Sequence, residues 1–399
     1  MLKICVIMGG VMPVPAVCGG AIETLVTSIV KKYSRADGLD LTVCSVFHPE
    51  AVKVAKQYPE VRFFWTHTRN IKYLLMHAVF LGVRMITGKS IRPLQRHYNE
   101  IAQLFKKEHF DLIIAEGGDT QAIADIAEGY RREQFVNHIH IHYLPPENIA
   151  ENYGHVIGVS EFVTNEYIKA CKTPVKAYTL KNAIDTAKFT KKVADDERNG
   201  IRQALGFEKQ DFVILYVGRI IKVKGVLELM EAVVGLEDKH IKLMIMGSAN
   251  SGKWTFSSYE KKVKRLSGKH KDRIRFTGYV DNSEVYKYAA AADIQCVPSL
   301  WEEAAGLVIL EAMAEGLPLI VTKSGGVTEY IDDSTALIIE KENITENLKK
   351  AILYMKENPE VRRQMSENGK IQSRKYDEQV YYKDFVKTVY EIEQDNREN

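Results

Sequence analysis

The sequence predicts an α/β protein made of two doubly wound domains, each with a parallel sheet that is covered by helices on both faces. Short apolar runs rich in β-branched residues alternate with segments of helical period, which is typical of parallel strands joined by crossover helices. There are twelve such runs, more than one open sheet commonly holds, so we expect two sheets. The expected strands lie at 2–8, 41–46, 61–65, 110–115, 135–141, 155–159, 212–217, 242–246, 273–277, 293–297, 317–321 and 335–339.

The boundary between the domains is predicted at the segment "YTLKNAIDTAKF" (178–189), because a polar, charged stretch, "KKVADDERNG", separates it from the next strand. We expect a first domain at 1–180 and a second at 181–375, each large enough to bury its own core. The last residues, 376–399, have a helical period and are expected to form a helix that packs back on the first domain.

The composition is that of an ordinary globular protein, with 45% hydrophobic and 27% charged residues. The five cysteines are scattered without a C-x-x-C pair, which argues against disulfides and zinc and favours a reducing cytosol. We interpret the opening "MLKICVIMGG" as the first strand, because its apolar run is too short for a signal peptide. The longest apolar stretch, 74–86, is too short to span a bilayer and is interrupted by His77 and Arg84. These features predict a cytoplasmic protein.

Two carboxylates flank the predicted start of a helix in "SLWEEAAGLVILEAMAEGLPLIVTKSGG" (299–326). The helix is expected to begin at Gly306 and Leu307, where free backbone N–H groups and a partial positive charge favour an anion. Glu303 lies before this point and Glu311 about 7.5 Å of helix rise beyond it. A nucleotide sugar matches the layout, with its diphosphate at the helix and hydroxyl groups on both sides. The alternative is that Glu311 faces solvent and Glu303 caps a loop.

The segment "EAAGLVILEAMAEGLPLIVTKSGGVTEYI" resembles the E-x7-E motif of retaining glycosyltransferases of family 4, which have the GT-B fold. Three further stretches resemble motifs of that family and occur in its order. They are "PVPAVCGGAIETLV", "KNAIDTAKF" and "YVGRIIKVKGV". The resemblance implies two Rossmann-like domains that face a central cleft, with the acceptor on 1–180 and the nucleotide-sugar donor on 181–375.

The resemblance assigns Arg219 and Lys224 to the donor diphosphate. An Arg at the end of a strand offers a fork of donors, and a Lys five residues later adds a second cation for the leaving group; both could equally be surface residues. Gly19 and Gly20 open a helix and could receive phosphate or acceptor against backbone N–H groups, or could simply form a tight turn.

The "HIHIH" run (138–142) places three histidines on one face of a strand. Alternate histidines can bind a metal, but no carboxylate partner is evident nearby in the sequence. The family usually has one histidine here that faces the donor sugar, which matches His140 first and His138 second. The resemblance further implies that Glu311 binds ribose and Glu303 binds sugar hydroxyls, with Gly306 and Leu307 at the diphosphate.

No metal or cofactor is expected. The chain contains no D-x-D motif, the carboxylate pair of metal-dependent glycosyltransferases, so cationic side chains and the helix dipole must meet the diphosphate charge. Two stretches imitate nucleotide P-loops. "GSANSGKW" (247–254) has Trp254 where Ser or Thr must reach magnesium, and "GVRMITGKS" (82–90) has one residue too many between its glycines.

These observations predict a retaining, metal-independent hexosyltransferase that uses a nucleoside-diphosphate sugar, with a UDP-sugar expected first, and a saccharide acceptor in surface-polysaccharide or glycan biosynthesis. An epimerase or phosphorylase of the same fold is the alternative enzyme, and a non-catalytic sugar-nucleotide-binding protein the alternative from another class. The basic segment 253–275 raises nucleic-acid binding, but it lacks interleaved aromatic residues, so we predict a solvated helix face and no nucleic acid.

A basic and apolar segment, 71–107, suggests a membrane partner. It holds seven Lys or Arg and a single acidic residue, Glu100. Each cation near an anionic surface contributes about 1 kcal/mol, so the acceptor domain could rest on the inner face of the plasma membrane without spanning it. An acceptor carried on polyprenyl diphosphate would give this location a purpose. The alternative is an ordinary core helix with solvated cations.

Overall fold

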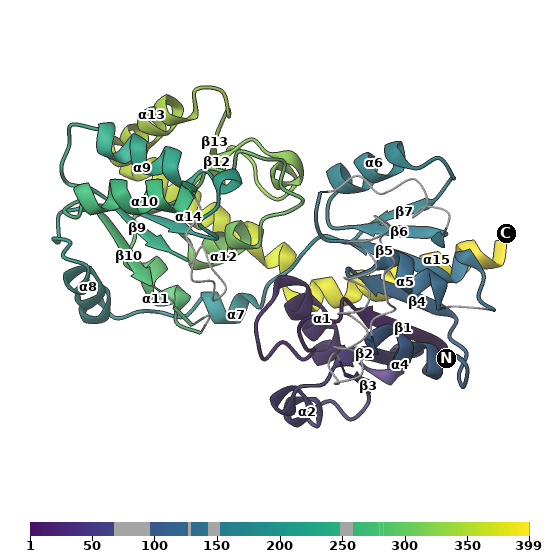
Figure 1. The fold of residues 1–399 in the computed structure, drawn as a ribbon. Coiled ribbons are helices and arrows are strands. Elements are labelled where there is room, and N and C mark those ends of the chain that lie inside the picture. Colours follow the sequence, from purple (N-terminus) through teal and green to yellow (C-terminus); the bar gives the residue numbers. More distant parts are fainter. Residues whose placement is uncertain are drawn as a thin grey trace, which may run out of the picture. The chain divides into compact units, whose positions relative to one another are not determined.

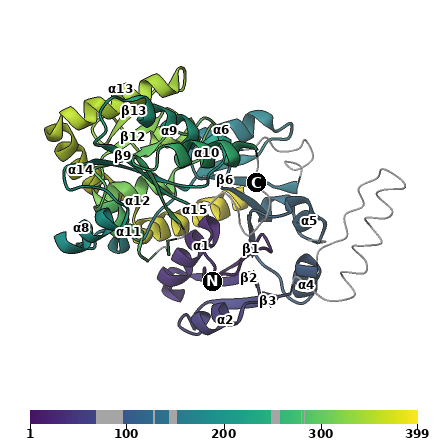
Figure 2. The ribbon, with the colours of Figure 1, turned by 60° about the vertical axis from the view of Figure 1, so that its left-hand side comes forward.

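The computed structural model describes residues 1–67, 96–126, 129–142, 152–247, 258–278, 280–281 and 283–398. The chain divides into two compact units. Unit 1 comprises Met1–Asn182 and Glu378–Asn399, and unit 2 comprises Ala183–Asp377. Each unit is an open parallel sheet with helices on both faces (Figures 1 and 2). The predicted α/β class with two doubly wound sheets is confirmed.

Unit 1 is built on a seven-stranded parallel sheet with the order β3-β2-β1-β4-β5-β6-β7. Its strands are β1 (Leu2–Met8), β2 (Leu39–Val46), β3 (Arg62–Thr66), β4 (Leu112–Glu116), β5 (Phe135–Ile139), β6 (His155–Gly158) and β7 (Lys176–Thr179). Its helices are α1 (Ala21–Lys32), α2 (Pro49–Ala55), α4 (Arg96–Phe105), α5 (Thr120–Asp125), α6 (Glu161–Ala170) and α15 (Glu378–Glu398). The strand order reverses between β1 and β4, and such a switch point is where open α/β sheets bind ligands.

Unit 2 is built on a six-stranded parallel sheet with the order β10-β9-β8-β11-β12-β13. Its strands are β8 (Phe212–Val217), β9 (Ile241–Met246), β10 (Ile274–Gly278), β11 (Ile294–Val297), β12 (Leu319–Thr322) and β13 (Ala336–Ile339). Its helices are α7 (Thr186–Phe189), α8 (Asp195–Ala204), α9 (Val226–Gly235), α10 (Ser258–Lys269), α11 (Val285–Ala290), α12 (Leu307–Glu315), α13 (Ile344–Glu357) and α14 (Pro359–Ser373). Here the switch point lies between β8 and β11.

The apolar runs of the central strands are buried on both faces of the sheet. In β8, Ile214 and Tyr216 belong to the core that packs on α9 and α13, whereas Val213 and Leu215 belong to the core that packs on α11 and α12. This alternation follows from the two-residue period of a strand. It explains why the sequence shows continuous apolar runs rather than alternating ones. The parallel pairing of β8 with β11 keeps the carboxyl ends of these two strands side by side.

The last helix, α15, returns the chain to unit 1 and lies along α1 (Figure 2). Glu378 at its start pairs with Lys32 (Nζ to Oε1, 2.9 Å), and Tyr382 donates a hydrogen bond to Asp37 (2.6 Å). At its other end Asn396 donates to the carbonyl oxygen of Glu133 (2.8 Å). The helix therefore contacts unit 1 along its length.

No helix among the described residues is both long enough and apolar enough to cross a membrane. The apolar stretch 74–86, most of the basic segment 71–107 and both P-loop-like stretches lie outside the described residues, apart from Gly247. Of the cations in 71–107, Arg96, Lys106 and Lys107 are described, and Nε of Arg96 donates to Glu100 (2.7 Å). In the second basic segment, Arg273 is buried and donates to the carbonyl oxygens of Ile241 and Leu236, so this residue stabilises the fold.

Candidate functional site

The predicted site residues fall into both units. Gly19, Gly20, His138 and His140 belong to unit 1. The others belong to unit 2: Arg219, Lys224, Glu303, Gly306, Leu307 and Glu311. In unit 2 they follow β8 and β11, the two strands at the switch point of the sheet, which is where the topology places a ligand. In unit 1, Gly19 and Gly20 follow β1, which borders the switch point, and the two histidines lie at the end of β5, one strand beyond β4.

Glu303 and Lys224 meet in unit 2, although 79 residues separate them in the sequence. Lys224 Nζ donates to Glu303 Oε1 at 2.5 Å, and the hydroxyl of Ser299 donates to the same oxygen at 2.5 Å. Glu303 is 7% exposed. Among the described residues, hydrogen bonds reach only Oε1, so the second carboxylate oxygen is left to accept from a ligand.

The backbone around this pair explains how the two residues approach each other. The 3₁₀ turn η4 (Lys222–Lys224) ends at Gly225, whose φ is 67°. A Cβ on Gly225 would lie 1.9 Å from the carbonyl oxygen of Pro298, so only glycine lets this turn pack against the end of β11. The amide of Leu300 donates to the carbonyl oxygen of Val223 (2.8 Å), which joins the two loops directly.

Arg219 follows the end of β8, five residues before Lys224. Its side chain is exposed and makes no hydrogen bond or ion pair within the described part of the chain. The hydroxyl of Tyr216 donates to the backbone oxygen of Arg219 at 2.8 Å. Burial, together with the nearby charge of Glu303, raises the pKa of Tyr216, so this phenol stays a neutral donor. Arg219 is therefore free to bind an incoming anion.

Trp301 places an aromatic ring next to Lys224, and the sequence analysis did not select this residue. Lys224 Nζ lies 5.4 Å from the centre of the Trp301 ring, within the range of a cation–π contact. The indole nitrogen of Trp301 is buried and has no hydrogen-bond partner among the described residues. The signal for it was present in the sequence, as an aromatic residue two positions before Glu303.

Helix α12 begins at Leu307, as predicted, and no side chain caps its amide end at Gly306. Glu311 follows one turn later. Burial raises the pKa of its carboxyl group to about 7, and the charge of Lys188 opposes that rise. Four residues further on, burial and the charge of Glu311 raise the pKa of Glu315 to about 9, and its Oε1 has no partner in the described ranges. Sequence reasoning did not single out Glu315.

In unit 1 the glycine loop leads into α1. Gly19 and Gly20 have positive φ angles of 78° and 100°, and Gly20 is the residue before the helix. A Cβ on Gly20 would lie 2.1 Å from Oε2 of Glu23, so the carboxylate of Glu23 lies over this turn. Burial, with the charge of Glu116, raises the pKa of Glu23. An incoming phosphate would therefore meet an acidic side chain here.

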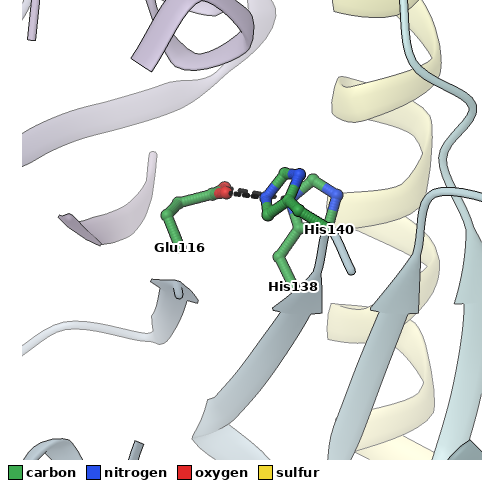
Figure 3. A group of neighbouring side chains, drawn as sticks. All are labelled: Glu116, His138 and His140. Atoms are coloured by element: carbon green, nitrogen blue, oxygen red, sulfur yellow. Dashed lines mark hydrogen bonds and ion pairs between the residues drawn. The ribbon is translucent and has the colours of Figure 1, made fainter. Parts of the chain in front are cut away.

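Glu116 is the carboxylate partner that the histidine run lacks in the sequence. It ends β4, directly beside His138 of β5 in the sheet register. Glu116 Oε1 lies 3.0 Å from His138 Nδ1, and Oε2 lies 2.6 Å from His140 Nε2 (Figure 3). The exposed fractions of the three side chains are 0%, 1% and 6% in the order Glu116, His138 and His140.

The electrostatics of this group favour an ionised carboxylate. Burial by itself would raise the pKa of Glu116, but the charges and hydrogen bonds of His138 and His140 lower it to about 2. Burial and the neighbouring His138 lower the pKa of His140. The ligand atoms of all three lie within 4.8 Å of one another, close enough to hold a metal ion, as do those of the more exposed group Glu208, Asp211 and His240.

Comparison with known proteins supports the predicted class. Residues 197–372, within unit 2, match the family described as glycosyl transferases group 1. The uncharacterized glycosyltransferase MJ1607 of Methanocaldococcus jannaschii is 32% identical over 44% of this chain and 44% of its own. The lipopolysaccharide 1,2-N-acetylglucosaminetransferase of Salmonella typhimurium is 28% identical over 56% of this chain and 58% of its own. The similarity to these two relatives thus spans about half of their length.

The whole chain resembles a solved structure. The crystal structure of Alr3699/HepE from Anabaena, in complex with UDP, aligns with a TM-score of 0.73 and 19% sequence identity, over 98% of this chain and 100% of that one. At this identity the likeness concerns the fold. The chain thus has the GT-B fold, and residues 197–372 carry a group 1 glycosyltransferase domain.

Proposed function

We propose that the protein is a retaining glycosyltransferase of family 4, which moves a hexosyl group from a nucleoside-diphosphate sugar to a saccharide acceptor without a metal ion. The observation that supports this most strongly is the Lys224–Glu303 pair, because it places a cation and a carboxylate with one free oxygen just before the uncapped end of α12. We propose a UDP-sugar as donor. The UDP-bound relative of the same fold supports this choice.

In this proposal, different residues of unit 2 bind different parts of the donor. Arg219 and Lys224 bind the diphosphate, together with the backbone amides at Gly306 and Leu307. Glu311 binds the ribose hydroxyls, and the free oxygen of Glu303 accepts a hydrogen bond from the hexose. The bond between the anomeric carbon and the diphosphate oxygen breaks while the acceptor oxygen bonds to the same face of that carbon. The acceptor proton passes to the departing diphosphate.

Unit 1 supplies the acceptor side in this proposal, with Gly19 and Gly20 at the loop and His140 supporting the sugar. We propose a saccharide acceptor carried on polyprenyl diphosphate, at the inner face of the plasma membrane, in surface-polysaccharide biosynthesis. The Salmonella relative is named for lipopolysaccharide, and this name supports a lipid-linked saccharide as acceptor without specifying the lipid. The basic segment that would contact the membrane lies mostly outside the described residues.

The test is a panel of nucleotide sugars, with thermal stabilisation, hydrolysis and transfer measured for each, and with free and polyprenyl-diphosphate-linked saccharides as acceptors. We expect a UDP-hexose to stabilise the protein and to yield a product of unchanged anomeric configuration, seen by proton NMR. Release of an epimerised sugar nucleotide would identify an epimerase instead. Stabilisation without hydrolysis or transfer by any donor and acceptor would identify a binding protein.

Transfer is expected to persist in an excess of EDTA. The reason is that Arg219, Lys224 and the end of α12 supply the positive charge that a metal supplies in enzymes with a D-x-D motif. The measurement compares initial rates before and after dialysis against EDTA, with a D-x-D glycosyltransferase treated in parallel as a control. A complete loss of transfer that Mg²⁺ or Mn²⁺ restores would contradict the prediction.

Arg219→Ala is expected to lower kcat about 10- to 100-fold, which corresponds to one lost charge-assisted hydrogen bond. The effect on kcat should exceed that on donor binding, because charge on the diphosphate grows as the glycosidic bond breaks. Lys222→Ala is the matched control, since Lys222 is an exposed cation of η4 next to the site. An equal or larger effect of Arg219→Ala on the dissociation constant of the donor would make Arg219 a binding residue alone.

A further inference from the structure

The contacts of Glu116 define where the protons of two buried histidines lie. An ionised carboxylate only accepts hydrogen bonds, so each ring nitrogen that faces Glu116 must carry a proton. The facing atoms are Nδ1 of His138 and Nε2 of His140, and Figure 3 shows both rings directed at the carboxylate. When both rings are neutral, they therefore hold opposite tautomers.

In opposite tautomers, each ring keeps one nitrogen whose lone pair can accept a hydrogen bond. Nε2 of His138 and Nδ1 of His140 are buried, and neither has a hydrogen-bond partner among the described residues. A buried nitrogen without a hydrogen-bond partner raises the free energy of the folded state, so such atoms commonly bind a ligand or a water molecule. The acidic side chain that faces the group from α1, Glu23, adds negative charge rather than a donor. Both free nitrogens therefore suit a neutral group that donates a hydrogen bond, such as a hydroxyl.

We propose that Glu116 is a positioning residue, which locks His138 and His140 in opposite tautomers so that their remaining nitrogens accept hydrogen bonds from sugar hydroxyls. The identification of the ligand as a sugar depends on the function proposed above, whereas the assignment of the tautomers does not. The position of these three residues also fits a ligand-binding role, because β4 borders the switch point of the unit 1 sheet and β5 is the next strand.

A metal ion is the competing explanation for three such ligands. Metal-bound histidines almost always donate their other N–H to a carboxylate, a carbonyl oxygen or water. A metal ion held between the facing nitrogens and Glu116 would leave the outward nitrogens as buried N–H groups with no protein partner in the described ranges. A metal ion on the outward nitrogens would find each facing N–H already donating to Glu116, at 3.0 Å and 2.6 Å, which is the usual arrangement of metal-bound histidines. Metal content is therefore an outcome of the test that distinguishes an ion from a hydroxyl group.

The first experiment is NMR of the full chain with ¹⁵N-labelled histidine, with the two signals assigned from His138→Asn and His140→Asn. We expect a proton on Nδ1 of His138 and on Nε2 of His140 at pH 7.5. In Glu116→Gln the side-chain amide accepts at one end and donates at the other, so one ring must change its tautomer. Glu100→Gln is the matched control, because Glu100 contacts a different histidine, His67, and both tautomers should stay unchanged.

The second experiment measures kinetics on the same variants. Glu116→Gln should lower kcat/KM for transfer about tenfold, the loss of one or two neutral hydrogen bonds, while the dissociation constant of UDP, which lacks the sugar, stays within about twofold. Identical tautomers for both rings, an unchanged kcat/KM in Glu116→Gln, or a stoichiometric metal that Glu116→Gln loses would each overturn the proposal. If the wild type transfers no sugar at all, the proposed function fails, and the spectrum alone decides whether Glu116 sets the tautomers.

Discussion

Glu303→Gln is expected to lower kcat for sugar transfer about 10- to 100-fold, the cost of one charged hydrogen bond. The carbonyl oxygen of glutamine can still accept from Lys224 and Ser299, which hold Oε1 in the wild type. The second oxygen becomes an amide that donates, so the acceptor for a sugar hydroxyl is lost. The loop keeps its backbone contacts, because the Glu303 amide donates to Ser324 (3.1 Å) and its carbonyl oxygen accepts from Gly326 (2.8 Å).

The control is Glu302→Gln, one position earlier. Glu302 is exposed, and its carboxylate pairs with Lys341 rather than with Lys224. Its substitution should leave kcat within about twofold, since exposed ion pairs contribute little. Both variants are compared with the wild type by thermal unfolding, kcat and KM. If correctly folded Glu303→Gln turns over near the wild-type rate, Glu303 has no part in binding the sugar.

The elements at the site could be predicted because their sequence patterns are local. β1 and β8 run over the predicted residues, since each is a single apolar run bounded by polar residues or glycine. The start of α12 at Leu307 follows from Gly306 and the apolar helical run after it. The closing Gly316, in the left-handed conformation with φ 74°, marks its end equally clearly.

β7 (Lys176–Thr179) was missed because it carries no such pattern. It is the edge strand of its sheet, and all four of its residues are exposed or only partly buried. A strand at an edge needs neither a continuous apolar run nor strict alternation, so its four residues do not stand out in the sequence.

The contacts of the site could not be predicted, because they join residues that are distant along the chain. Glu116 lies 22 residues before His138, and their contact depends on β4 and β5 being neighbours in register. One signal was available, namely a carboxylate at the end of one strand and alternating histidines at the end of the next. The Lys224–Glu303 pair likewise depends on the reversal of strand order between β8 and β11.

Glu311→Gln is expected to weaken donor binding, with KM for the donor raised about tenfold at pH 8, because a ribose hydroxyl then loses a charged acceptor. Burial raises the pKa of Glu311 to about 7. Hydroxyl groups donate to the ionised form, so donor affinity in the wild type should rise as the pH increases through 7. In Glu311→Gln this pH dependence should vanish, which a titration of the donor between pH 6 and pH 9 can measure.

The same pKa shift makes a separate prediction for stability. A carboxyl group whose pKa is raised by folding stabilises the folded state fully below its unfolded pKa, and this contribution is lost as the pH rises through the folded pKa. The loss begins near the ordinary carboxyl pKa of 4.5 and is complete above about pH 7 for Glu311 and above about pH 9 for Glu315. Glutamine cannot ionise, so both Glu311→Gln and Glu315→Gln should unfold at a higher temperature than the wild type once the pH exceeds these values.

Glu315→Gln therefore separates ribose binding from burial. The two glutamates lie four residues apart on α12, both are partly buried, and both have raised pKa values. If Glu311 binds ribose, both substitutions stabilise the protein at high pH, but only Glu311→Gln changes KM for the donor. An unchanged donor titration in Glu311→Gln, with the expected gain in stability, would mean that this carboxylate is merely buried. A loss of stability in both variants would mean that their ionised forms have partners in the fold, contrary to the raised pKa values.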